Sequence, residues 1–153
     1  IAAGRLDLAL TLIRPGETRP AEPLWQEGYC LALPVTHRLA GRAEVAPEEV
    51  AGDTMTARRS CEALAETSRF FTERGVRPPF SFRSPNDDRA LAMVRAGQGI
   101  TVIPASLASP GLATPALAGF PLRRTIGLLH AHEGLPDHPL AQALRDAAGG
   151  LRP

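Results

Sequence analysis

Short apolar runs alternate along this chain with segments in which apolar residues recur at helical spacing. The run Leu6–Ile13 is nearly continuous, which predicts a strand buried on both faces, as in a parallel sheet. Further strands are expected at residues 29–35, 53–57, 80–84, 99–104 and 124–130. A single helical turn is expected at 47–50, and helices at 60–75, 89–96 and 139–149. Strands alternating with helices indicate the α/β class with parallel strands.

The predicted helices carry capping residues at their ends. Ser60 stands where an N-cap residue belongs and Gly75 where a C-cap glycine belongs, which bounds the first long helix. Ser84 and Asp87 have the spacing of a capping box, with aspartate in place of the usual glutamate, at the start of the second helix. Gly97 is expected to end that helix.

Composition limits the possible function classes. The 153 residues suffice for one domain or two small lobes, and 44% hydrophobic with 22% charged residues is typical of a soluble globular protein. No apolar stretch approaches the roughly 18–20 residues of a membrane span. Two cysteines cannot form a disulfide scaffold, so we expect a cytoplasmic protein without membrane contact.

The charged residues narrow the possibilities further. The net charge is +1, which gives no support for DNA binding by this chain alone. All 17 basic residues are arginine, so lysine Schiff-base chemistry and a Walker A loop are excluded. Arginine is also the cation whose planar fork best matches carboxylates and phosphates.

The start of the first long helix is the strongest candidate site. Arg58, Arg59, Ser60 and Cys61 would place cations and backbone N–H groups together, a combination that attracts anions. The alternative is a pair of solvated arginines beside an ordinary N-cap.

Three other residues stand at the carboxyl ends of predicted strands. Pro85 and Asn86 follow the strand at 80–84, in the position where parallel sheets bind ligands, although plain helix capping by Ser84 or Asn86 is the slightly favoured explanation. Thr11 stands at the end of the first strand, where a structural β-branched residue is the alternative interpretation.

The remaining motifs point away from catalysis. A polar cluster near the C-terminus has metal-like content but lacks a ligand pattern typical of zinc, so a strand end running into a polar loop is favoured; it contains His130, His132, Glu133, Asp137 and His138. No nucleophile elbow is present, and Cys61 has no evident histidine partner. We therefore expect no enzyme activity, no metal and no cofactor.

Four segments occur together in a characteristic order: GRLDLAL from Gly4, LALP with His37 and LA at 39–40, VRAGQGITVIP from Val94, and RTIGL from Arg124. In this series the chain resembles the effector-binding domain of LysR-type transcriptional regulators. The resemblance implies a two-lobed fold like that of type 2 periplasmic binding proteins. Residues 1–25 and 126–153 would form a first lobe, incomplete in this chain, and 26–125 the second. The crossing strands would lie near residues 24–33 and 122–130.

The resemblance also implies a function. A small, anionic effector would bind between the lobes, near Arg58–Cys61, Thr11, Pro85 and Asn86, and control transcription. The regulator would be a homo-oligomer, a dimer or tetramer, that contacts DNA only through an N-terminal winged helix-turn-helix absent from this chain. The alternative is a solute-binding protein of a transport system with the same fold.

The resemblance adds one hypothesis for Cys61. Its position matches the one that the peroxide-sensing branch of the family uses, and a helix start beside Arg58 and Arg59 should lower the pKa of the thiol. Cys30 is predicted on a separate strand, so a resolving cysteine is missing nearby. An inert small side chain is the favoured interpretation.

Overall fold

The computed structural model describes residues 6–132 and 138–151 and divides into two compact units. One unit comprises the chain up to Gly28 together with the chain from Arg123 onward; the other is Tyr29–Leu122. The strands are β1 (Leu8–Ile13), β2 (Ala21–Pro34), β3 (Glu44–Val45), β4 (Met55–Arg58), β5 (Phe80–Ser84), β6 (Thr101–Pro104), β7 (Leu112–Ala113), β8 (Ala116–Leu117) and β9 (Arg123–His130). The helices are α1 (Leu64–Glu73), α2 (Asp87–Arg95) and α3 (Pro139–Gly149), with 3-10 turns at Pro47–Val50 and Ala105–Leu107.

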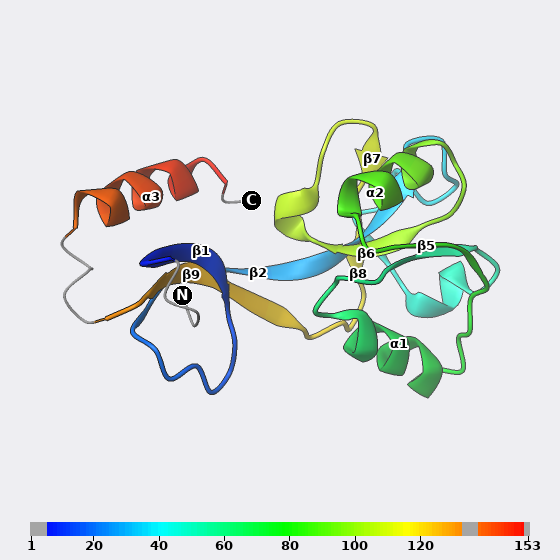
Figure 1. The fold of residues 1–153 in the computed structure, drawn as a ribbon. Helices are drawn as coiled ribbons and strands as arrows, with labels where there is room; N and C mark the ends of the chain where they lie inside the picture. Colours follow the sequence, from blue (N-terminus) through cyan, green and yellow to red (C-terminus); the bar gives the residue numbers. More distant parts are fainter. Residues whose placement is uncertain (1–5, 133–137, 152–153) are drawn as a thin grey trace. The chain divides into compact units, whose positions relative to one another are not determined.

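The first unit is an antiparallel sheet beside one helix. β1 pairs with β9 from Leu8↔His130 to Ile13↔Thr125, and β9 pairs on its other side with the first half of β2. α3 contacts β1 (Figure 1) and buries Ala141 and Ala148, which are seven residues apart and so lie on one helix face.

The expectation of parallel strands throughout is wrong for this unit and for most of the other. β1 is half-buried along its whole length instead of buried on both faces, and it begins at Leu8. Its partner β9 lies more than a hundred residues away in the sequence, and an apolar run carries no information about the direction of such a distant partner.

The second unit combines both pairing modes. The second half of β2 pairs antiparallel with β6, β7 and β8, while β3–β8 and β4–β5 are parallel. Figure 1 shows α1 and α2 on opposite sides of the layer that contains β5 and β6. Leu31, Leu33 and Ile100 belong to the larger core cluster, and Ala32 and Ile103 to a separate cluster beside α2. β2 is thus buried on both faces in this unit.

The helix boundaries follow local hydrogen bonding. The C-terminus of α1 is as predicted: Gly75 has φ +71, and the Gly75 and Val76 N–H groups donate to Thr72 O and Phe71 O in a Schellman arrangement. Its start differs from the prediction, because two turns, Cys61 N to Arg58 O and Leu64 N to Cys61 O, precede it. Ser60 is therefore not an N-cap.

The start of α2 also differs from the predicted capping box. Asn86 is the N-cap residue, and its side-chain oxygen accepts a hydrogen bond from Arg89 N at 2.9 Å. Ser84 Oγ accepts from Asn86 N at 3.0 Å and thus orders the turn before the helix. Asp87 does not take part in capping but pairs with Arg58, a contact that no local sequence pattern indicates.

Candidate functional site

Two loops at the carboxyl ends of β4 and β5 lie side by side in the second unit. The strands pair in parallel with Arg58 opposite Ser84, and the N–H group of Arg59 donates to Ser84 O at 2.8 Å. The loop that begins at Arg58 and the loop of Pro85 and Asn86 therefore share one edge of the sheet. Such an edge is where open α/β sheets bind ligands.

Arg58 holds this edge together. Its side chain is only 3% exposed, and it donates from Nε and Nη2 to the two carboxylate oxygens of Asp87 at 2.9 and 2.6 Å. Nη1 donates to Val102 O at 3.2 Å and contacts Cys61 Sγ at 3.4 Å. Burial is the largest single influence on the pKa of Arg58 and lowers it, but the hydrogen bonds to Asp87 and the attraction of nearby Cys61, Asp87 and Glu62 together raise the pKa overall. The cation is therefore permanent and already neutralised.

The other residues predicted at this edge are exposed. Arg59 and Ser60 lie outside β4, and within the described chain the Arg59 guanidinium has no hydrogen-bond or ion-pair partner. Pro85 and Asn86 are exposed as well, with the Asn86 oxygen engaged in capping α2. Arg59 is thus a cation at this edge that is available to an anion.

Thr11 belongs to the first unit. It is half-buried on β1 and lines a shallow depression with Arg14, Glu17 and Arg19. Glu17 accepts from Arg19 Nε at 2.6 Å, and this hydrogen bond lowers the pKa of Glu17 to about 2. A role for Thr11 in the same ligand site stays a prediction.

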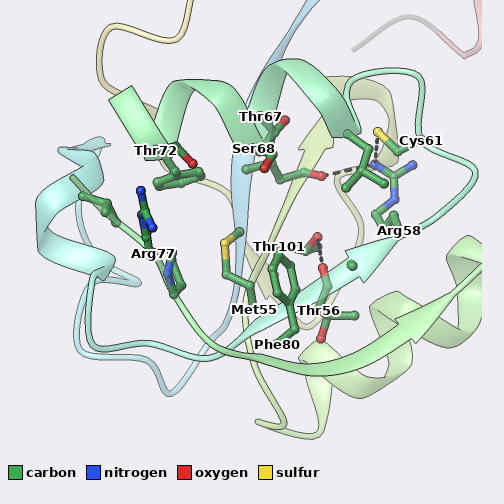
Figure 2. Close-up of a pocket in the computed structure, with 16 residues that line it drawn as sticks. Met55, Thr56, Arg58, Cys61, Thr67, Ser68, Thr72, Arg77, Phe80 and Thr101 are labelled. Atoms are coloured by element: carbon green, nitrogen blue, oxygen red, sulfur yellow. Dashed lines mark hydrogen bonds between the residues drawn. The ribbon is translucent and has the colours of Figure 1, made fainter. Parts of the chain in front are cut away.

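A cavity of about 200 Å³ lies between α1 and strands β4, β5 and β6 (Figure 2). Arg58 and Cys61 line it, so two of the predicted residues face this space. The other lining residues are Met55, Thr56, Ala57, Leu64, Thr67, Ser68, Phe71, Thr72, Val76, Arg77, Pro78, Phe80, Thr101 and Val102. No pattern in the sequence predicted the cavity itself. The available signal was polar Thr67 and Ser68 on the helix face that also carries Leu64 and Phe71.

Cys61 differs from its sequence-based expectation. The half-buried thiol has a raised pKa, because burial disfavours the thiolate more strongly than the nearby Arg58 favours it. The expectation that the arginines and a helix start would lower this pKa is therefore wrong. α1 begins three residues later, at Leu64, so its N–H groups do not start at Cys61.

Slow thiol chemistry is expected at Cys61. Because only the thiolate attacks and the pKa is raised, labelling at pH 7 should be several-fold slower than for a cysteine in an unstructured peptide. The rate should rise as the pH increases through the raised pKa. The measurement is absorbance during reaction with a disulfide reagent, in a Cys30→Ser variant that leaves one thiol. Labelling as fast as the peptide would contradict the assigned environment.

The polar residues near the C-terminus do not form a metal site in the described part of the chain, where no cluster of at least three metal-ligating side chains occurs. His130 is buried at the end of β9, His132 is exposed, and His138 caps α3 by accepting from Leu140 N at 3.1 Å. Glu133 and Asp137 lie outside the described residues. None of the described helices is long and apolar enough to cross a membrane.

The chain resembles known regulators in sequence. It is 29% identical over 157 residues to the DNA-binding transcriptional dual regulator OxyR of Escherichia coli (strain K12), which covers 98% of this chain and 50% of that protein. The chain thus spans about half the length of this curated relative.

Solved structures agree with the fold. HinK, a LysR family transcriptional regulator from Pseudomonas aeruginosa, matches with a TM-score of 0.77 at 23% identity, over 99% of this chain and 56% of that one. The effector binding domain of QuiR in complex with shikimate matches with a TM-score of 0.68 at 19% identity, over 96% and 72% of the two chains. The fold is therefore that of LysR effector-binding domains, which resembles type 2 periplasmic binding proteins. The profile of the LysR substrate binding domain matches residues 1–151, and the chain belongs to this family.

Proposed function

We propose that this chain is the effector-sensing domain of a bacterial LysR-type transcriptional regulator. It binds a small organic anion and catalyses no reaction. The regulator works in the cytoplasm as a homo-oligomer, and its DNA contacts are made outside this chain. OxyR and HinK are described as transcriptional regulators, which favours this function over a solute-binding protein of a transport system.

The observation that carries the proposal is the shared edge of β4 and β5. The Arg59 N–H···O Ser84 bond and the Arg58–Asp87 ion pair join the two loops, while Arg59 and Ser60 remain exposed. A carboxylate at this edge receives forked donors from Arg59 and a hydroxyl from Ser60. Charge-assisted hydrogen bonds of this kind are the strong ones in proteins.

The ligand acts through differential affinity. A regulator that exists in two arrangements shifts toward the one whose site binds the effector more tightly, and no ligand shifts the equilibrium otherwise. Because Arg58 already holds the loops of this edge in place, the effector does not have to order them when it binds.

Substitution of Arg59 tests this site. A charge-assisted contact contributes about 1.5–3 kcal/mol, so Arg59→Ala should weaken anion binding roughly ten- to a hundredfold. Ser60→Ala should weaken it by a smaller factor, since a neutral hydroxyl makes a weaker bond. The measurement is a thermal-shift screen with three classes of anion: carboxylates such as shikimate, inorganic sulfate, and phosphate esters. Each ligand that stabilises the chain is then titrated by calorimetry.

Arg69→Ala is the matched control, because Arg69 is an exposed arginine on α1 away from this edge. It should bind like the parent. If only neutral ligands stabilise the chain, or if Arg59→Ala and Ser60→Ala both bind like the parent, the site assignment is wrong.

A further inference from the structure

The cavity beneath α1 is a separate compartment with mainly apolar walls. Met55 and Ala57 line it from β4. Phe71 lines the cavity from the helix and Val102 from β6, and Phe80 of β5 lines it as well. Figure 2 shows Phe80 among the lining side chains. All of these residues belong to the second compact unit, so the cavity is complete within it.

The volume sets the size of an occupant. An apolar cavity of roughly 150 Å³ in another protein stays dry and takes up benzene, which has six non-hydrogen atoms. At about 200 Å³ the present cavity accommodates about eight such atoms by the same ratio. That size corresponds to one aromatic ring with one or two substituent atoms.

A buried hydroxyl supplies one directional contact. Thr101 is 3% exposed, and its hydroxyl donates to Thr56 O at 2.8 Å. Figure 2 shows this hydroxyl in the middle of the cavity lining. Because its single proton is already used, Oγ1 of Thr101 offers only acceptor lone pairs. A ligand group that bonds to it must therefore be a donor, such as a hydroxyl.

The charges around the cavity disfavour an anion. The Arg58 guanidinium at one end is paired with Asp87, and the raised pKa of Cys61 keeps the neighbouring thiol neutral at pH 7. Arg77 lies at the other end, where it is exposed to solvent. A carboxylate beside Thr101 would lose its hydration, would find no free proton on that hydroxyl, and would lie away from Arg77 at the solvent-exposed end.

We propose that this cavity binds a neutral, single-ring molecule whose hydroxyl group donates a hydrogen bond to Thr101. This site goes beyond the proposed function, because the anion at Arg59 and Ser60 would bind at the exposed sheet edge. The chain would thus respond to two chemically different ligands.

Benzyl alcohol is a suitable probe, since it has eight non-hydrogen atoms and one hydroxyl. Calorimetric titration of the 153-residue chain should show saturable binding at one site. Ala57→Leu fills the cavity and should weaken binding at least about tenfold. Ala65→Leu makes the same change on the exposed face of α1 and should leave binding unchanged.

Thr101→Val tests the hydrogen bond without filling the cavity. It should weaken benzyl alcohol binding by about tenfold and leave toluene binding within about twofold of the parent, because toluene makes no hydrogen bond. Thr101→Ser restores the hydroxyl and should restore benzyl alcohol binding. Circular dichroism of each variant confirms that it is folded before titration.

The proposal is overturned if benzyl alcohol fails to bind the parent chain, or if both Ala57→Leu and Thr101→Val bind it like the parent. Benzoate that competes with benzyl alcohol at equal affinity would overturn the preference for neutral ligands. The two sites can be tested separately. If carboxylate binding is weakened by Arg59→Ala but is unchanged in folded Ala57→Leu, the proposed function stands whatever the outcome for the cavity.

Discussion

Asp87→Ala is expected to destabilise the chain more than Arg58→Met, although Asp87 is the more exposed partner. The Arg58 side chain is 3% exposed and the Asp87 side chain 37%. Removal of Asp87 leaves a buried guanidinium without its counter-charge, and such unpaired buried charges cost about 3–5 kcal/mol. Removal of Arg58 leaves a carboxylate that water reaches, and methionine retains much of the buried volume, so we expect about 1–3 kcal/mol.

Urea denaturation followed by far-ultraviolet circular dichroism measures both losses. Asp88→Ala is the matched control, because Asp88 is an exposed acid in the same first turn of α2, where it interacts with the helix dipole. It should cost less than about 1 kcal/mol. The double variant Arg58→Met/Asp87→Ala should recover part of the loss of Asp87→Ala, since no charge is then left unpaired. A larger loss for Arg58→Met than for Asp87→Ala would contradict the assigned roles.

Gly127→Ala should be the most disruptive small substitution in the first unit. A Cβ at this position of β9 would collide with the backbone oxygen of Glu22 in β2, and it would lie 2.5 Å from Ile13 Cδ1 in β1. The Ile13 side chain can rotate away, but the collision with the Glu22 backbone is relieved only if β2 and β9 move apart. We expect a loss of about 3 kcal/mol or more, at the upper end for overpacking.

Trp25 makes this loss measurable, because it is the single tryptophan and pairs with Ile126, the residue before Gly127. Its fluorescence during urea titration follows the β2–β9 pairing. Gly28→Ala is the control: its Cβ would meet only the Arg123 side chain, at an ordinary 3.8 Å. That variant should be within about 1 kcal/mol of the parent. Equal losses for the two variants would show that strand propensity, and not the collision, governs position 127.

Local patterns in the sequence predicted several elements closely. The strand at Phe80–Ser84 and the helix at Pro139–Gly149 have their expected bounds, because alternation in the first and an N1 proline in the second are local signals. Gly75 ends α1 as expected. The antiparallel β1–β9 pairing was not predictable, since it depends on residues that are distant in sequence.

The candidate site shows the same limit. The sequence indicated that Arg58–Cys61 and Pro85–Asn86 follow neighbouring strands, and the β4–β5 pairing brings these segments together. It did not indicate which arginine is available. Period-two alternation indicates that neighbouring residues of a strand point to opposite faces. It cannot indicate that Asp87, from a different element, is the hydrogen-bond partner of Arg58.

The contacts of Arg58 also connect the sheet edge to neighbouring elements. One side chain joins the end of β4, the first turn of α2 and the backbone of β6 at Val102. These contacts couple the two strand-end loops, so we expect a ligand that displaces Arg59 to move the N-terminus of α2 as well. If the chain senses an effector as we propose, substitutions in the first turn of α2 should alter the transcriptional response while effector affinity stays normal, which would separate signal transmission from ligand recognition.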